Sequence, residues 1–534
     1  MIKMNKIKCI NKCFAAIPAL TLAFLFAFTA CSAGSNAKQP SGGAKELVIG
    51  IPGSISTLDV NQESGILNYY IGGIVNDGLV TLDNSGKTIP GLAESWETED
   101  SSVWVVKLRS GAKFSDGATV TVEDVIWSLE RAQDPERSPG MAVYFPDYVQ
   151  SMEKVDDSTL RITLDGSHPS FIWSLSNVGG LFVTQKAWGE QAGSIGSPQD
   201  LLMGSGPYKV VEFVPGSHIS LAAQDYWWGG KPEIERIRLD FITDEAAYLL
   251  AFTQGDIDFA LNIPVEQGDQ WENTPGATVE YYADRSYYGI MIDSTVEPFD
   301  NEHVRKAVAY SIDAAGIRDN ILGGHASVAA AITPPEQFAS AIDVGEARTL
   351  LEGITRYDFN IEKAREEFAL SGVAPFETTV YYPDSYQNTG KASLVLADAL
   401  KEIGITVTVR EVPLDQWLAE IGGGQGISWM IYFATTAEPA EIAAWLLDGT
   451  GPGYNPANFT DAEIAALISG VLSVPSVDGI GDLVRAHDLA QSKAYYAPVW
   501  WGESAIAWGE RITVTGFNSY TMLSDNWPQN FTFK

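Results

Sequence analysis

Short apolar segments alternate with amphipathic segments along most of the chain. Apolar or alternating runs predict β-strands at residues 46–51, 103–108, 159–164, 234–241 and 405–412. Apolar residues at three- and four-residue spacing predict helices at residues 122–132, 244–254, 301–312, 360–370 and 391–403. Because strands and helices are interleaved, the pattern predicts an α/β fold with mixed sheets.

Polar residues and glycines mark several ends of these elements. Thr121 is the expected N-cap of the 122–132 helix, and Asp124 lies in its first turn, where the helix dipole favours a negative charge. Gly255 is expected to end the 244–254 helix. A Phe-Ser-Asp-Gly sequence at 114–117 predicts a turn in which the glycine takes the positive φ.

The first thirty residues follow another pattern. Lysines from Lys3 to Lys12 precede an apolar run at 14–30, which ends in small residues just before Cys31. This is the layout of a secretory signal, and Cys31 makes it resemble a bacterial lipoprotein signal, in which that cysteine is lipid-modified before cleavage. We therefore expect a signal peptide at 1–30 and lipidation of Cys31. The alternative is that residues 14–30 form an uncleaved membrane anchor, although this apolar run is at the short limit of length for spanning a bilayer.

The residues after the signal are typical of a linker. Residues 31–45 are rich in Gly, Ser, Asn and Pro and predict a flexible tether. Cys9 and Cys13 lie in the leader, so Cys31 is the one thiol left after cleavage, and neither an internal disulfide nor a thiolate metal site is expected. We therefore expect a monomeric extracytoplasmic protein, lipid-anchored to the cell membrane on its periplasmic side or outer surface.

Length and charge exclude several classes of function. At roughly 100–200 residues per domain, 534 residues favour two to four domains or lobes. There are 34 Lys and Arg against 68 Asp and Glu, a net charge of -34, which argues against a surface that binds nucleic acid. The five histidines lack metal-ligand spacing, and GxSxG, P-loop and EF-hand motifs are absent from the sequence. We therefore expect no metal, no cofactor and no catalytic residues.

Nine segments occur in the order typical of one protein family. The segments are Thr57-Leu58-Asp59, Gly78-Leu79-Val80, residues 90–96 (PGLAESW), 108–117 (LRSGAKFSDG), 121–125 (TVEDV), 204–208 (GSGPY), 254–258 (QGDID), 298–300 (PFD) and 304–307 (VRKA). They resemble the family 5 extracellular solute-binding proteins of ATP-binding cassette importers, the dipeptide, oligopeptide and nickel group. The resemblance runs from about Glu46 to the C-terminus.

The resemblance implies a two-lobe periplasmic-binding-protein (Venus flytrap) fold with an extra subdomain in lobe one. The ligand would lie between the lobes, and the closed state would be recognised by the permease. The main part of lobe one is expected at 46–83, 200–288 and 500–534. The extra subdomain is expected at 84–199, and lobe two at 289–499.

The resemblance also implies two ligand-binding segments. The loop after Asp59 reaches the cleft in relatives, which places Glu63, Ser64, Gly65 and Ile66 at positions that contact ligand. The second segment, residues 428–439, resembles a strand-to-loop segment that lines the cleft. Its expected binding residues are Trp429, Phe433, Ala434, Thr435, Thr436 and Glu438.

Thr435 departs from the family pattern. In peptide-binding relatives this position is an Asp that pairs with the free α-amino group of the ligand, and a buried ammonium needs such a carboxylate. Either Glu63 or Glu438 supplies that charge here, or the ligand has no such amino group.

The sequence therefore predicts a binding protein that captures a small solute, an oligopeptide or a related compound, and delivers it to an importer permease with its ATPases. An alternative is the same transport role with a different ligand, namely a sugar, an opine-like compound or a chelated metal. Two alternatives come from other functional classes. One is an exported carboxylate hydrolase, and the other is a sensory or chaperone protein with the same fold.

Overall fold

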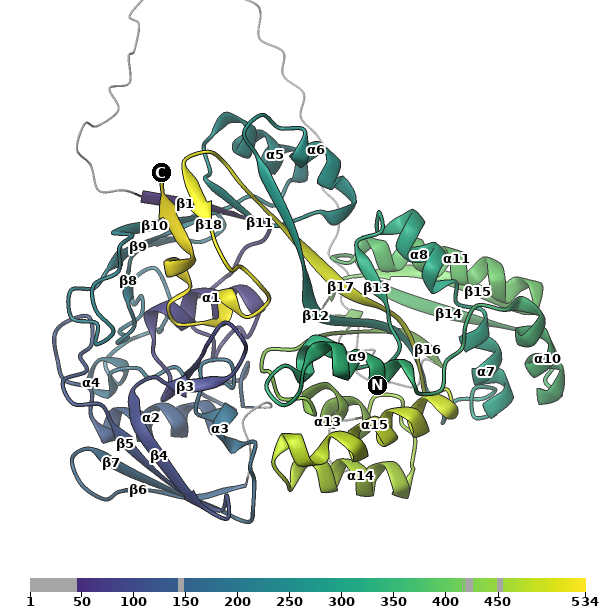
Figure 1. Ribbon diagram of the computed structural model, residues 1–534, viewed down its shortest axis with the longest axis horizontal. Helices are drawn as coiled ribbons and strands as arrows, with labels where there is room; N and C mark the ends of the chain where they lie inside the picture. Colours follow the sequence, from purple (N-terminus) through teal and green to yellow (C-terminus); the bar gives the residue numbers. More distant parts are fainter. Residues whose placement is uncertain (1–45, 143–147, 415, 418–425, 449–454) are drawn as a thin grey trace, which may run out of the picture. The chain divides into compact units, whose positions relative to one another are not determined.

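The computed structural model describes residues 46–142, 148–414, 416–417, 426–448 and 455–534 (Figure 1). The expected signal peptide, Cys31 and the tether lie outside the described residues. Among the described residues, no helix is long and apolar enough to cross a membrane.

A mixed sheet forms the centre of the fold, and in the described part of the chain it has nine strands. Eight of them follow one another in the order β16 (Ile427–Phe433), β12 (Thr278–Ile292), β17 (Tyr496–Trp508), β11 (Phe259–Ile263), β1 (Glu46–Ile51), β10 (Arg236–Phe241), β9 (His218–Ala223) and β8 (Tyr208–Val214). The ninth, β13 (Ala326–Val328), pairs with β17. The neighbours β11, β1 and β10 run parallel, and the other pairs are antiparallel.

Four smaller sheets complete the strand inventory of the described residues. One has the order β4 (Ala93–Glu99), β5 (Val103–Leu108), β7 (Thr159–Leu164) and β6 (Val149–Lys154). The others pair β2 (Val80–Leu82) with β3 (Thr88–Pro90), β14 (Phe376–Pro383) with β15 (Ile405–Val412), and β18 (Ile512–Val514) with β19 (Phe531–Phe533).

Helices cover both sides of these sheets (Figure 1). In the first half of the chain they are α1 (Ile66–Val75), α2 (Val122–Gln133), α3 (Phe171–Ser174), α4 (Lys186–Gly189), α5 (Glu245–Gln254) and α6 (Gly268–Glu272). Next come α7 (Glu302–Tyr310), α8 (Ala314–Ile321), α9 (Val344–Glu352), α10 (Ile361–Ser371), α11 (Gln387–Glu402), α13 (Glu441–Leu447), α14 (Ala462–Leu472) and α15 (Ser476–Ser492). Short 3₁₀ turns are η1 (Val265–Gln267), η2 (Pro335–Phe338), η3 (Thr521–Leu523) and η4 (Trp527–Asn530).

The strand and helix predictions are confirmed with small changes at the ends. The strands expected at 46–51, 103–108, 159–164 and 405–412 have the same bounds in the structure, and the strand expected at 234–241 begins at Arg236. Thr121 and Asp124 form a capping box at the start of α2. Gly255 ends α5 in the left-handed conformation, with φ 76°.

Most of the hydrophobic cores fall into two sets, and a smaller core joins them by packing Ala437 against residues such as Tyr69, Trp173 and Phe182. One set draws on residues between Leu47 and Trp271 together with residues 505–531, and we call this part lobe one. The other set draws on residues 287–501, and we call this part lobe two. Because the two sets share no residues, each lobe has its own buried apolar surface, and the smaller core adds apolar contact between the lobes.

Two long strands run from one lobe into the other (Figure 1). β12 and β17 pair antiparallel along most of their length, and the register shifts between Ala283 and Tyr287 and again at Gly289. Arg285, inside the first irregular stretch, has a positive φ of 64°. The regular ladder is therefore interrupted where the chain passes between the lobes, which is where a hinge would bend.

Gly50 shows how closely the elements pack in lobe one. A Cβ atom at this position would lie 2.4 Å from the Tyr248 ring and 2.6 Å from Ile257 Cδ1. The Tyr248 hydroxyl oxygen lies 2.7 Å from the carbonyl oxygen of Gly50 and 2.8 Å from that of Leu261, and its one proton can be donated to either acceptor. Glycine is therefore required for α5 to pack directly on β1.

Candidate functional site

A cavity of about 1570 Å³ is lined by residues of both lobes. Lobe one contributes the start of α1, residues around α3, and the end of β1. Lobe two contributes the end of β16, the loop that follows it, and parts of α13 and α14. Tyr288, on the crossing strand β12, lines the cavity between them. This is the position expected for a ligand enclosed between two lobes.

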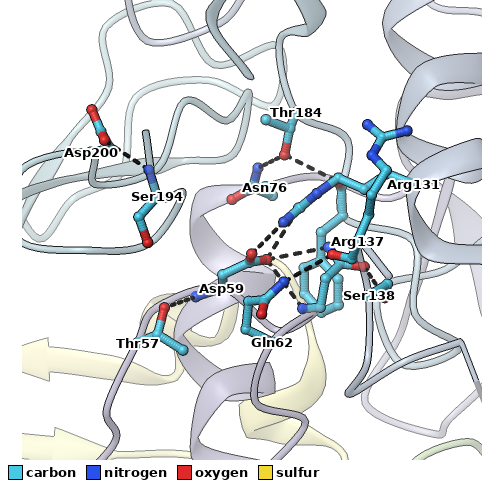
Figure 2. A network of polar contacts seen from close by, with 12 residues as sticks. Thr57, Asp59, Gln62, Asn76, Arg131, Arg137, Ser138, Thr184, Ser194 and Asp200 are labelled. Atoms are coloured by element: carbon cyan, nitrogen blue, oxygen red, sulfur yellow. Dashed lines mark hydrogen bonds and ion pairs between the residues drawn. The ribbon is translucent and has the colours of Figure 1, made fainter. Parts of the chain in front are cut away.

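The lobe-one wall begins with a loop that is fixed by a buried ion pair (Figure 2). The Asp59 carboxylate is bound by the guanidinium of Arg131 on α2, and both side chains are at least nine-tenths buried. Beside them the Ser138 hydroxyl donates to Asn61 Oδ1 at 2.8 Å, and Gln62 Nε2 donates to the Arg137 carbonyl at 2.9 Å. These contacts tie residues 59–62 to α2 and the turn after it, and so position the residues that follow.

Two of the four residues expected in this loop line the cavity. Ser64 and Ile66 form part of its wall and are half-buried. Glu63 is turned toward its own loop, where its Oε2 atom accepts from the backbone N–H of Ser56 at 2.9 Å and from the Ser56 hydroxyl. Gly65 is exposed at the N-cap position of α1. Neither Glu63 nor Gly65 is part of the cavity lining.

Of the residues expected to bind ligand in the second segment, 428–439, some line the cavity and others do not. Phe433, Thr435, Thr436 and Glu438 line the cavity. Trp429 and Ala434 instead lie in the cores of lobe two, with exposures of 1% and 4%. The indole Nε1 of Trp429 donates to Ser393 Oγ at 2.7 Å, so its polar end is turned away from the cavity.

Glu441 organises the loop that carries the two threonines. Its Oε1 atom accepts from the Thr435 N–H at 3.0 Å, and its Oε2 atom accepts from the Thr436 N–H at 2.9 Å and from the Thr436 hydroxyl. Gln337 Nε2 donates to the same carboxylate at 3.2 Å. Burial raises the pKa of Glu441, and hydrogen bonds from Thr436 and Thr435 act against this rise. Sequence reasoning missed Glu441, although an acid in the first turn of a helix is a usable signal.

Glu438 joins the two walls of the cavity. Its Oε2 atom accepts from Trp173 Nε1 at 3.2 Å and from Ser476 Oγ at 2.7 Å, and its Oε1 atom accepts from Ala440 N–H at 3.4 Å. Trp173 belongs to α3 in lobe one, so this hydrogen bond connects the two lobes. Burial raises the pKa of Glu438. The role of Trp173 had no signal in the local sequence.

Aromatic rings form the wall nearest the crossing strands. Tyr288 stacks on Trp500 with ring centroids 4.6 Å apart, and Phe433 lies within 6.1 Å of both Tyr288 and Tyr386. Phe433 is 38% exposed and forms part of the cavity lining. Such a wall can hold apolar or cationic parts of a solute.

The residues that the structure describes include no group of three or more His, Cys, Asp or Glu side chains that could hold a metal ion. Of the described histidines, His168 lines the cavity, and its Nε2 atom is 2.8 Å from Asp165 Oδ1. The cavity thus has the features of a binding site for an organic solute, with apolar walls and a few fixed polar groups.

The fold and the cavity define the class of two-lobe solute-binding proteins. A family model described as "Bacterial extracellular solute-binding proteins, family 5 Middle" matches residues 87–454. The chain belongs to this family. The glutathione-binding protein GsiB of Escherichia coli (strain K12) is 26% identical over 412 residues, which cover 76% of this chain and 77% of GsiB.

Solved structures confirm the predicted α/β two-lobe fold. The binding protein AgaA from A. tumefaciens R10, in complex with agropinic acid, is 23% identical, with a TM-score of 0.77 over 92% of this chain and 99% of AgaA. DppA from Helicobacter pylori, an ABC transporter-associated binding protein in complex with the peptide STSA, is 20% identical, with a TM-score of 0.76 over 92% of this chain and 98% of DppA.

The family fixes the broad function. Its members are extracytoplasmic binding proteins of ABC importers that take up peptides or other solutes, and they are not enzymes. The carboxylate-hydrolase alternative is therefore set aside.

Proposed function

We propose that this chain captures an oligopeptide or a related small solute between its lobes and delivers it to the permease of an ABC importer. The observation that carries the proposal is the cavity of about 1570 Å³, whose wall comes from both lobes beside the crossing strands β12 and β17. Pockets for drug-sized ligands measure roughly 300–1,000 Å³. The cavity therefore has room for a short peptide.

Solute capture would close the cavity by bending at the crossing strands. The interrupted ladder between Ala283 and Tyr287 is the proposed hinge. Ser64, Ile66, Phe433, Thr435, Thr436 and Glu438 are the proposed contact residues. Glu63, Gly65, Trp429 and Ala434 are proposed to hold these walls in place. The Trp173–Glu438 hydrogen bond belongs to the closed arrangement in this proposal.

The boundaries of the lobes are part of the proposal. We assign 46–83, 200–288 and 500–534 to the main part of lobe one, 84–199 to its extra subdomain and 289–499 to lobe two. The boundaries at 288 and 500 fall within β12 and β17, and Tyr287, Trp500 and Trp501 beside them pack in the core of lobe two. The four-stranded sheet of β4–β7 falls within the proposed subdomain.

We further propose that a lipid on Cys31 holds the body at the membrane through the tether at 31–45. Cys31→Ser is then expected to move the protein from the membrane fraction to the soluble fraction while the circular dichroism of the body stays unchanged. If the variant stays in the membrane fraction, the apolar run at 14–30 is itself the anchor.

A solute panel tests the capture role directly. Di- to pentapeptides, amino sugars, opines and histidine-chelated nickel are added to residues 32–534, and the melting temperature is recorded. At least one solute is expected to raise the melting temperature, because a ligand that binds only the folded state stabilises it. Calorimetry should give one solute per chain, and the solute should be recovered chemically unchanged. The proposal fails if no solute shifts the melting temperature, or if the bound solute is recovered as a reaction product.

A further inference from the structure

The two carboxylates that could receive an amino group of the solute are already used by the protein. Glu63 is not part of the cavity lining, and its Oε2 atom accepts from the Ser56 N–H. Glu438 lines the cavity, but its Oε2 atom accepts from Trp173 Nε1 and from Ser476 Oγ. Burial raises the pKa of Glu438, so its surroundings disfavour the charged form. Neither side chain is therefore an ionised, unpaired acceptor for an ammonium group.

The other ionisable side chains in the described lining also have partners within the protein. Both oxygens of Glu441 accept from the Thr435–Thr436 backbone, and burial raises the pKa of Glu441. His168 Nε2 lies 2.8 Å from Asp165 Oδ1, and Asp448 interacts within the protein as well. Each ionisable group of the described lining is thus already engaged before a solute arrives.

The lining that the structure describes contains no Lys or Arg. Arg285, whose charge acts on Glu441, is 2% exposed and lies outside this lining. Its guanidinium donates to the Thr436 carbonyl at 2.7 Å and to the Ser519 carbonyl at 3.0 Å. A carboxylate or phosphate group of a solute would therefore lose its hydration without meeting a Lys or Arg side chain in this wall.

The wall instead offers uncharged polar groups and aromatic rings. Ser64, Ser170 and Ser174 are half-buried in the lobe-one wall, and their hydroxyls form no hydrogen bond with the described residues. Tyr288 on β12 and Phe433 on β16 add two rings with centroids 6.0 Å apart. Serine hydroxyls can donate to, and accept from, amide or hydroxyl groups, and the rings can contact apolar faces.

The cost of desolvation then decides which solutes fit. An ionised group that leaves water for this wall gains no unpaired counter-charge, which is costly, whereas an amide or hydroxyl group can exchange water for the serine hydroxyls. Thr435 acts in the same direction, because its side chain carries no charge and its N–H is bound by Glu441. The wall thus discriminates against charge through the partners that it does not supply.

We propose that the cavity selects uncharged polar solutes, which carry amide or hydroxyl groups but neither an ionised amino group nor a carboxylate. The inference rests on the proposed capture role and names the class of solute. It narrows the oligopeptides of that role to those with blocked or cyclised ends. A neutral oligosaccharide presents the same chemistry from a second source, and the test separates the two.

The test uses one tripeptide backbone in different charge states. Calorimetric titrations compare N-acetyl-trialanine amide, which is uncharged, with trialanine amide as a cation, N-acetyl-trialanine as an anion and trialanine as a zwitterion. Cellotriose is the uncharged saccharide. At least one of the two uncharged probes is expected to bind one per chain, about tenfold or more tightly than every charged probe. The uncharged probe that binds identifies the source of the solute.

The inference is overturned if a charged probe binds as tightly as the uncharged probes, or if neither uncharged probe binds. A charged probe that binds one per chain and is recovered chemically unchanged would still support the capture role. The two proposals therefore fail separately.

A pair of substitutions at Thr435 tests whether the missing charge sets the preference. Thr435→Asp adds a carboxylate to the wall and should strengthen binding of trialanine amide about tenfold or more. Thr435→Asn, the matched control, has nearly the same shape as the aspartate variant without its charge, and it should bind trialanine amide no more tightly than the parent protein. Equal affinities of the two variants for trialanine amide contradict the inference. If the aspartate variant does not fold, the charge series on the parent protein decides.

Discussion

At the scale of single residues, buried charges have the largest consequences. Asp59 and Arg131 pair with side-chain exposures of 4% and 8% at the base of the loop that leads into the cavity. The wall residues Ser64 and Ile66 follow within this loop and the start of α1. A charge that supports the fold therefore also determines where part of the cavity wall lies.

Replacing Arg131 with Met should lower the free energy of unfolding by about 3–5 kcal/mol, because it leaves the Asp59 carboxylate buried and unpaired. Urea unfolding followed by circular dichroism measures this change. Lys107→Met is the control, because Lys107 pairs with Glu94 at exposures of 58% and 52% and should contribute about 0–1 kcal/mol. If both variants lose the same free energy of unfolding, burial of the Asp59–Arg131 pair does not determine its contribution to stability.

Asp77 and Asp525 form a second buried pair, of like charge. Burial raises the pKa of Asp77 to about 6, and burial together with the negative charge of Asp77 raises the pKa of Asp525 to about 8. The folded state thus binds protons more tightly than the unfolded state, where both values are 3.8. The stability from this pair is therefore fully present below about pH 4 and is lost as the pH rises toward 8.

Asp525→Asn should reduce this loss, because the amide cannot ionise and no longer repels Asp77. As the pH rises from 5 to 8, the stability difference should move in favour of the variant by on the order of 3–4 kcal/mol. Urea unfolding across this range measures the difference. A constant difference between the two proteins at every pH would contradict the assignment.

At the scale of elements, local signals set most helix and strand ends. α2 starts where Thr121 Oγ1 accepts from the Asp124 N–H at 3.3 Å, while the Asp124 carboxylate accepts from the Thr121 N–H at 2.9 Å. Each side chain thus satisfies a backbone donor that the first turn would leave without a partner.

Thr121→Ala should cost about 0.5–2 kcal/mol, because it removes one half of this capping box. Chemical denaturation of the purified variant measures the cost. Thr121→Ser keeps the hydroxyl and should restore most of the stability. If serine and alanine are equally destabilising, the methyl group of Thr121 rather than its hydroxyl supports the helix.

Sequence patterns predict the features that depend on neighbouring residues, and they miss those that depend on distant ones. The strand at Ile405–Val412 and the cap at Thr121 are encoded within a few residues. α11 begins at Gln387, four residues before the predicted start, and the residues between, Gln-Asn-Thr-Gly, include no large apolar side chain that would signal a helix. The Trp173–Glu438 contact joins residues 265 positions apart, so local pattern gives no sign of it.

The family resemblance located the two cavity segments but not the direction of every side chain. Thr435 and Glu438 line the cavity, whereas Trp429 is turned into the core by its bond to Ser393. Neighbours on a strand point to opposite faces, and side-chain partners decide the rest in the loop that follows. A pattern read along the chain cannot supply those partners.

At the scale of the whole molecule, two lobes with largely separate cores share one cavity, two crossing strands and one small common core. In the proposed capture role the two lobes would move as units, and the interrupted β12–β17 ladder would concentrate bending in a few residues. A solute held by both walls would stabilise the closed arrangement in proportion to its contacts with both lobes.

Native mass spectrometry of residues 32–534 tests the central claim most directly, with the parent protein and Ser64→Trp compared. Ser64 lines the cavity, so the indole should fill solute space, and Thr253→Trp on the exposed face of α5 is the matched control. The parent and the control are expected to carry one solute per chain after solute is added, and Ser64→Trp is expected to carry none. Full occupancy of Ser64→Trp would contradict the account, because the solute would then be bound outside the cavity between the lobes.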